Sequence, residues 1–222
     1  MNRSEAHRTH GLNHEAFAAI NEQSAYWCGF LMADGCIHRR SEDSYQIILF
    51  LQERDKDHIA KYKTFLQSEH KIITRKPNGK GWRAAASTSY GLSFNSTRIA
   101  TDLASFGVTQ SKSHTASVKR LANNRHFWRG VVDGDGSVYR RGGKYNYPGL
   151  FLCGSLPLMN QFLAYLTKHI PDIKCSVTRS PTVYTLHVGG KAAREACGLL
   201  YGRASVALER KESVARGIIE GR

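Results

Sequence analysis

The sequence predicts an α+β fold made of two pseudo-symmetric αββαββα repeats, each about 100 residues long. The first observation behind this prediction is that Ala25–Gly35 resembles His126–Gly136, with an offset of 101 residues. The second is that later landmarks recur in the same order, namely Tyr90–Phe94 as Tyr184–Val188 and Lys112 as Lys211. Two copies are too few for a solenoid, so we expect the repeats to pair about a pseudo-two-fold axis.

Hydrophobic periodicity assigns the elements of the first repeat. A helix is predicted to be capped by Ser24, a good N-cap residue, and to end at Gly35, a residue type common just past helix ends. Apolar residues at strand or helix spacing then predict two hairpins and two further helices. In chain order these are the strands Ile37–Arg40 and Tyr45–Gln52, the helix Asp55–His70 with Asp55 as its cap, the strands Lys71–Lys76, Gly81–Ser87 and Tyr90–Asn95, and the helix Thr97–Phe106.

The second repeat shows the same order of patterns after a connecting segment. Its predicted strands and helices are Val138–Arg141, Tyr145–Leu152, Leu158–His169, Cys175–Arg179, Val183–Val188 and Ala192–Leu200. We therefore expect four parts in the chain: an N-terminal arm over 1–13, a first half over 14–112, a linker over 113–124 and a second half over 125–222.

Composition narrows the class of partner. The chain of 222 residues carries 32 Lys and Arg against 18 Asp and Glu, and its formal net charge of +14 indicates a polyanion such as nucleic acid. No apolar run approaches the roughly 18 residues that cross a membrane, and the start lacks the apolar segment of a secretory signal. Five scattered cysteines without a C-x-x-C pair argue against structural zinc. We expect reduced thiols in a cytoplasmic or organellar, nucleoid-associated protein.

Basic residues concentrate in segments predicted to be strands. From His70 to Thr101 there are six Lys and Arg and no acid, and from Gly136 to Pro171 there are four and no acid. A basic sheet face is suited to lie along duplex DNA, because a β-ribbon fits the major groove. Alternating polar residues such as Ser93 would add hydrogen bonds. The candidate DNA-binding residues are His38, Arg39, Arg40, Arg75, Lys76, Lys80, Arg83, Arg140, Arg141, Lys144 and Arg179.

The recurring helix has small residues four positions apart, which lie on one helix face and allow two helices to approach closely. These pairs are Gly29 with Ala33 and Gly130 with Gly134. If the helices pack there, Asp34 and Asp135 emerge together at one end, beside the free carbonyls of the helix termini. Carboxylate and carbonyl oxygens are the ligands that Mg²⁺ prefers, so the pattern predicts a cation site.

Two segments, Trp27-Cys-Gly-Phe-Leu-Met-Ala-Asp-Gly35 and Trp128-Arg-Gly-Val-Val-Asp-Gly-Asp-Gly136, resemble the paired motifs of the two-motif, single-chain LAGLIDADG homing endonucleases. The first segment departs from the motif at Met32, where the family has its earlier acid. The resemblance extends over most of the chain, from about His14 to Ser213. It implies that the motif helices meet at the centre of a saddle, formed by two antiparallel sheets, that binds double-stranded DNA.

The resemblance also implies residue roles. Asp34 and Asp135 would bind two or more Mg²⁺ or Mn²⁺ ions, assisted by the carbonyls of Ala33 and Gly134. Lys112 and Lys211 would each stand near a scissile phosphate. A polar, water-positioning residue is implied near Gln52 or Glu53, and its counterpart near Cys153 is not evidently polar. The implied activity is a site-specific, metal-dependent double-strand cut that leaves 3′ overhangs, made by a monomer.

Two alternative functions stay open at this point. An RNA maturase would use the same fold to assist splicing, with intron RNA as its partner. A non-catalytic DNA-binding regulator would use the basic sheets alone. The retention of both Asp34 and Asp135 favours the nuclease over either alternative.

Overall fold

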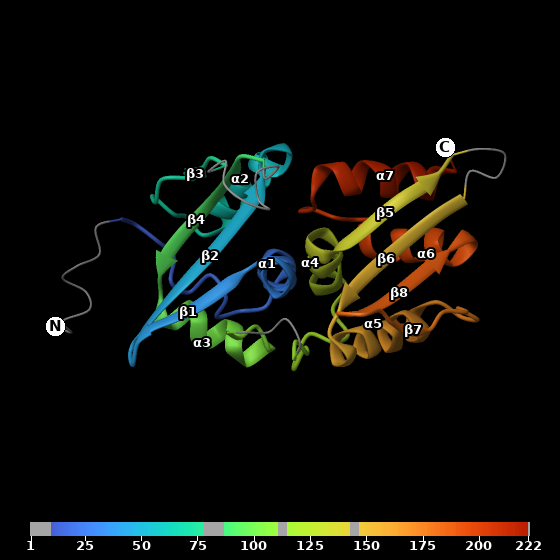
Figure 1. Cartoon of the computed structure of the whole chain (residues 1–222), viewed down its shortest axis with the longest axis horizontal. Helices are drawn as coiled ribbons and strands as arrows, with labels where there is room; N and C mark the ends of the chain where they lie inside the picture. The colour runs from blue at the N-terminus through green and yellow to red at the C-terminus, as the bar shows by residue number, and fades with distance from the viewer. Residues whose placement is uncertain (1–9, 78–86, 111–114, 143–146, 222) are drawn as a thin grey trace.

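The computed structural model describes residues 10–77, 87–110, 115–142 and 147–221. In these ranges it contains seven α-helices and two four-stranded antiparallel sheets (Figure 1). The strand orders are β1-β2-β4-β3 and β5-β6-β8-β7, so the second sheet repeats the connectivity of the first. The predicted α+β fold with two pseudo-symmetric sheets is confirmed.

The helices and strands follow the predicted order closely. The first half contains α1 (Glu22–Ala33), β1 (Cys36–Ser41), β2 (Ser44–Gln52), a 3₁₀ turn (Glu53–Asp55), α2 (Lys56–Phe65), β3 (Ile73–Arg75), β4 (Ser89–Asn95) and α3 (Thr97–Phe106). The second half contains α4 (Arg125–Asp135), β5 (Gly136–Arg141), β6 (Tyr147–Gly154), α5 (Leu156–His169), β7 (Val177–Arg179), β8 (Tyr184–Gly189), α6 (Gly190–Tyr201) and α7 (Glu209–Glu220).

The ends of two helices differ from the prediction. The N-cap of α1 is Asn21, and Ser24 is instead the third helical residue, whose hydroxyl completes the capping box with the Asn21 backbone N–H. Gly35 is not in the left-handed conformation expected after a helix. A Cβ added at this position would lie 2.7 Å from the carbonyl oxygen of Leu31, so only glycine has room here. The predicted helix to His70 ends at Phe65, and Gln67 follows in a left-handed conformation.

Two other differences concern whole elements. The sequence prediction missed α7, although Ala215 and Ile218 are buried with helical spacing. The strand predicted over Gly81–Ser87 lies outside the described residues except for its last position. Within the described part of the chain, β3 pairs instead with β4. No helix in this part is long and apolar enough to span a membrane.

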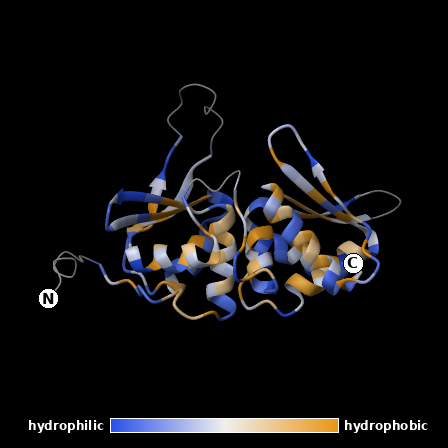
Figure 2. Ribbon diagram, turned by 90° about the horizontal axis from the view of Figure 1, so that it is seen from below, coloured by the Kyte–Doolittle hydropathy of each residue, from blue (hydrophilic) through white to orange (hydrophobic). Residues whose placement is uncertain are grey.

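Each sheet packs one face on helices. In β2, Ile47 and Leu49 are buried, whereas the alternating Gln46 and Ile48 face the other way. Figure 2 shows both sheets on one side of the molecule and the helices on the other, so the outward faces of the two sheets look in the same direction. The buried residues of both halves form a single hydrophobic cluster.

The two motif helices, α1 and α4, cross at their glycines. A Cβ on Gly29 would lie 2.0 Å from the carbonyl oxygen of Phe127, and one on Gly130 would lie 2.1 Å from that of Tyr26. Real Cβ atoms do not approach backbone oxygens this closely. The crossing of the two helices therefore requires glycine at both positions.

A buried polar network also crosses this interface. The Asp133 carboxylate accepts hydrogen bonds from the hydroxyls of Tyr26 and Tyr201, at 2.8 and 2.7 Å, and from the backbone N–H of Leu208 at 2.7 Å. His58 Nε2 lies 2.7 Å from the Tyr26 hydroxyl. Because Tyr26 donates its proton to Asp133, His58 donates to Tyr26. Leu208 is the N-cap of α7, so the network holds α7 against both motif helices.

Arg129 forms a second connection between the halves. Its guanidinium is fully buried and donates to the carbonyl oxygens of Val206 and Leu200, at 2.8 and 3.0 Å, and to Glu22 of α1 at 3.0 Å. Glu22 also accepts from the backbone N–H of Ser205. The start of α1 is thereby attached to the segment between α6 and α7.

The buried His58 ring predicts a loss of stability in acid. Burial lowers the pKa of His58 to about 3, far below its ordinary value of 6.5. Between these values the unfolded chain binds a proton that the folded chain does not, so stability falls as the pH falls. We expect this group to contribute a slope of about 1.4 kcal/mol per pH unit. Urea unfolding at pH 7, 6, 5 and 4 should show that slope reduced by this amount in His58→Gln, and equal slopes in both proteins would contradict the assignment.

Candidate active site and nucleic-acid interface

The two predicted catalytic acids stand at adjoining helix ends. Asp34 is the C-cap of α1, Asp135 is the last residue of α4, and both are exposed. A Cβ on Gly134 would lie 2.3 Å from the Ala33 Cβ and 3.4 Å from Asp34 Oδ2. The structure therefore brings the C-terminal ends of the two helices into contact, with one carboxylate from each half. Carbonyl oxygens at helix C-termini add partial negative charge, which favours a cation there.

The oxygen donors fit a hard divalent ion. Asp34, Asp135 and the carbonyls of Ala33 and Gly134 are the candidate protein ligands. No group of three or more His, Cys, Asp and Glu side chains within the described ranges is arranged to hold a metal. Mg²⁺ characteristically binds one or two carboxylates and completes its shell with water and substrate phosphates. A two-carboxylate site that opens outward matches this pattern.

A cavity of about 240 Å³ lies beside Asp135. Its lining includes Met32 and Ala33 from the first half and Cys153 from β6. The Cys153 thiol donates to the carbonyl oxygen of Asp135 at 3.6 Å, and burial raises the pKa of this thiol. The second half therefore places a neutral thiol where a polar water-positioning residue was sought.

Lys211, for which the resemblance implies a place near a scissile phosphate, lies at the end of α4. Its ammonium is buried and donates to the carbonyl oxygens of Val132, Asp133 and Gly136 at 2.9, 2.6 and 2.6 Å, and to that of Gly134 at 3.4 Å. Burial lowers the pKa of Lys211 to about 8. The lysine thus stabilises the end of the helix that carries Asp135. Its counterpart Lys112 lies outside the described residues.

Three predicted DNA-binding residues of the first half share its outward face. His38 and Arg40 are exposed on β1, and Arg75 of β3 lies over the Phe50 ring with its guanidinium carbon 3.5 Å from the ring centroid. Lys76 is exposed just beyond β3. Arg39 is also exposed, but alternation along β1 puts it on the side of the buried Ile37. Lys80 and Arg83 lie outside the described residues.

Fewer of the predicted DNA-binding residues of the second half lie on the outward face of its sheet. Arg141 is exposed at the end of β5. Arg140 instead donates to the carbonyl oxygen of Gly217 on α7 at 2.7 Å, so its side chain lies on the helix side of the sheet. Arg179 pairs with Tyr184, which shares its face of β8 with the buried Leu186. Lys144 lies outside the described residues.

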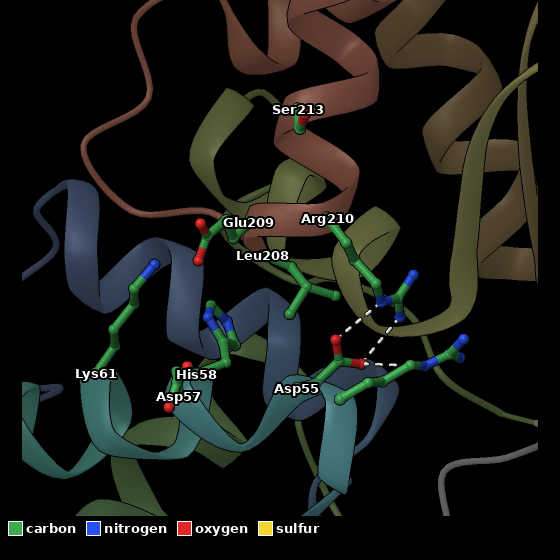
Figure 3. Close-up of a pocket in the computed structure, with 9 residues that line it drawn as sticks. Asp55, Asp57, His58, Lys61, Leu208, Glu209, Arg210 and Ser213 are labelled. Carbon is green, nitrogen blue, oxygen red and sulfur yellow. Dashed lines mark hydrogen bonds and ion pairs between the residues drawn. The ribbon is translucent and has the colours of Figure 1, made fainter.

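An ion pair between α7 and the turn that follows β2 joins the two halves (Figure 3). Arg210 of α7 donates from Nε and Nη2 to the two carboxylate oxygens of Asp55, at 2.8 and 3.0 Å. The pair borders a cavity of about 360 Å³ between α2 and α7, which His58 also lines. Asp55 was predicted to cap its helix, but it makes no capping hydrogen bond and pairs with Arg210 instead.

The chain has the fold of the LAGLIDADG homing endonucleases. The homing endonuclease I-WcaI bound to its DNA recognition sequence is similar over 86% of this chain and 85% of its own, with a TM-score of 0.63 and 14% sequence identity. The LAGLIDADG meganuclease I-AabMI bound to uncleaved DNA is similar over 91% and 90%, with a TM-score of 0.59 and 12% identity. I-SmaMI, bound to an uncleaved DNA target in the presence of calcium ions, is similar over 90% and 91%, with a TM-score of 0.56 and 11% identity. No protein-family model and no curated protein matches the sequence.

Proposed function

We propose that the chain is a site-specific endonuclease that cuts both strands of a long, asymmetric DNA target and leaves 3′ overhangs. The observation that carries this proposal is the meeting of Asp34 and Asp135 at the adjoining ends of α1 and α4, between two sheets whose outward faces look the same way (Figure 2). One acid from each half provides one carboxylate for each strand. The net charge of +14 supports binding to a polyanion.

The proposed chemistry is hydrolysis of one phosphodiester bond in each strand. Mg²⁺ or Mn²⁺ held by Asp34, Asp135 and the carbonyls of Ala33 and Gly134 would polarise the phosphate and lower the pKa of an attacking water. The two carboxylates would hold this metal centre in a fixed position. Each stands at the end of a motif helix, and the ends of the two helices are in direct contact. Exposed cations on the outward faces would hold the backbone of the duplex.

We assign Lys211 a positioning role in this reaction. Its four carbonyl partners surround the last turn of α4, and one of them is the carbonyl of Gly134, a proposed metal ligand. The ammonium therefore fixes that turn and adds positive charge beneath the site. The proposed organisation keeps 14–112 and 125–222 as the two halves of a monomer, with 113–124 as the linker.

Lys211→Met is expected to slow cutting of the strand served by Asp135 more than cutting of the other strand. The physical reason is that the variant leaves carbonyl oxygens at the end of α4 without a buried donor, at about 1–3 kcal/mol for each group that stays dry. Strand-specific end labels would separate the two rates, and unfolding curves would report stability. Lys191→Met, at an exposed lysine of α6, serves as the control and should change neither. Equal slowing of both strands would contradict the positioning role.

The proposed function is tested by selection and cleavage. Purified protein with Mg²⁺ is incubated with a library of randomised duplexes, and cut molecules are recovered through their new ends. The expected result is one long asymmetric sequence, cut on both strands with 3′ overhangs, with cleavage stopped by EDTA. Retention of a specific sequence without cutting, in Mg²⁺ or Mn²⁺, would support a DNA-binding regulator instead. Splicing activity on intron RNA without DNA cleavage would support a maturase.

A further inference from the structure

On the outward face of the first sheet, a chain of three hydrogen-bonded side chains crosses three strands. Arg40 of β1 donates from Nη2 to Oε1 of Gln46 on β2. Gln46 donates from Nε2 to Oγ of Ser93 on β4 at 2.8 Å. Ile47 and Leu92, the neighbours of Gln46 and Ser93, are buried in the core, so these side chains lie on the face away from the helices.

The direction of these bonds fixes the orientation of each group. A guanidinium has only donors, so the oxygen of the Gln46 amide must face Arg40 and its nitrogen must face Ser93. Arg40 is exposed, and no carboxylate in the described part of the chain pairs with it. A guanidinium that is already held by a fixed acceptor loses less freedom when it binds a second pair of acceptors.

Strand pairing identifies the matching positions in the second sheet. Cys36 pairs with Ile48 just as Ser137 pairs with Phe151, and both pairs follow the Asp-Gly of their motif. By the same registers, the counterpart of Gln46 is Gly149 and that of Ser93 is His187. The second half therefore has no side chain at the position of Gln46, the central residue of the three.

A different pair occupies this place. The Tyr139 ring covers Gly149 so closely that a Cβ there would lie 2.5 Å from Tyr139 Cζ. The Tyr139 hydroxyl is hydrogen-bonded to His187 Nε2, and the two rings are stacked with an interplanar angle of 26°. By the same count from the motif, Tyr139 is the counterpart of His38 and Arg141 is that of Arg40. Both halves thus carry an arginine at this place, but only Arg40 has a glutamine and a serine beside it, and the second half has Gly149 and the Tyr139–His187 pair there instead.

From this difference we infer that Arg40 is a specificity-determining residue that reads a guanine in the first half-site, with Gln46 and Ser93 as positioning residues. The inference rests on the proposed function. Guanine presents two acceptors, O6 and N7, in the major groove, and a bidentate arginine is the commonest specific contact with them. Arg40 lies four residues beyond Cys36, about 13 Å along β1 and hence about four base pairs outward from the motif end. The symmetric position of the second half-site lacks this guanine preference, because Gly149 has no side chain to hold Arg141 as Gln46 holds Arg40.

The test is a base-by-base specificity profile of the target selected above. For each position the three other base pairs are substituted, and relative binding is measured in Ca²⁺ with wild-type protein and with Arg40→Ala, Ser93→Ala and Ser93→Thr. We expect wild-type protein to prefer guanine about 5- to 150-fold at one position of the first half-site. Arg40→Ala should remove that preference and leave the profile elsewhere unchanged.

The positioning role has its own readout. Ser93→Ala should reduce the guanine preference several-fold while the affinity for non-specific DNA and the melting temperature stay the same, and Ser93→Thr should keep the preference because it keeps the hydroxyl. Arg141→Ala is the matched control, expected to weaken binding in a salt-dependent way without altering the preference for any base. If wild-type protein selects a target and Arg40→Ala leaves every preference intact, or removes a preference for another base, the inference is wrong. If wild-type protein selects no DNA at all, the proposed function itself fails.

Discussion

Asp135→Asn is expected to abolish cutting of one DNA strand while the other strand is still nicked, and Asp34→Asn is expected to do the same with the strands reversed. The neutral amide removes one of the two carboxylates at the helix ends, and a metal ion that contributes several kcal/mol to a phosphoryl transition state then binds poorly. The expected loss is roughly 10³-fold or more in the rate of double-strand cleavage. A supercoiled plasmid carrying the target would be converted to the nicked circle and not to the linear form.

This experiment separates chemistry from binding. Both variants should retain the wild-type affinity for the target, measured in Ca²⁺, because neither carboxylate contributes positive charge. Asp57→Asn removes an exposed carboxylate of α2 that lines the cavity between α2 and α7, and it should cleave like wild-type protein. Normal double-strand cutting by both helix-end variants would show that the metal site lies elsewhere.

The second large effect concerns stability. Gly130→Ala is expected to lower the free energy of unfolding by about 3 kcal/mol, the upper end of the usual range for overpacking. The new methyl group would lie 2.1 Å from a backbone oxygen of α1, and a backbone cannot turn aside as a flexible side chain can. Urea unfolding monitored by circular dichroism gives the change directly.

Gly198→Ala is the matched control for this substitution. Gly198 lies inside α6, and a Cβ there meets nothing within 4 Å. The same chemical change should therefore stabilise the protein by roughly 0.5–1 kcal/mol, because alanine favours the helix. Destabilisation of similar size by both substitutions would mean that the effect comes from the helix backbone and not from the crossing of α1 and α4.

The sequence was sufficient to predict the duplication, the helix crossing and the acids at its end, since these depend on local spacing. Glycines four residues from a second small residue mark a helix face that can approach another closely. An Asp-Gly at the end of two such helices then places both carboxylates together. The hairpins β1–β2, β5–β6 and β7–β8 were also predictable, because a sheet with one buried face keeps the alternation of apolar and polar residues along each strand. The pairing of β3 with β4 was not predicted.

The directions of single side chains were less predictable. Arg140 and Arg141 are adjacent, and only the strand register decides which one reaches the outward face. The same holds for Arg75 and Arg179. By strand register, Arg75 lies on the outward face of its sheet and Arg179 on the helix side of its own. Lys211 was expected near a scissile phosphate, and its burial depends on α7, which packs across the end of α4. The one indication of this packing in the sequence was Asp133. The equivalent residue of the first motif, Met32, is not acidic.

The polar contacts between α1 and α4 also have a consequence for recombination. Tyr26 with Asp133 and Glu22 with Arg129 are pairs in which each half supplies one partner. A first half from another protein with an apolar residue in place of Glu22 would leave the buried Arg129 without its carboxylate, at about 3–5 kcal/mol. One with an apolar residue in place of Tyr26 would remove one of the three donors to Asp133, at about 1–3 kcal/mol. Each half is therefore suited to the other. To build a nuclease with a hybrid target by exchanging one half for a foreign half, the partner side chains must be transferred as well.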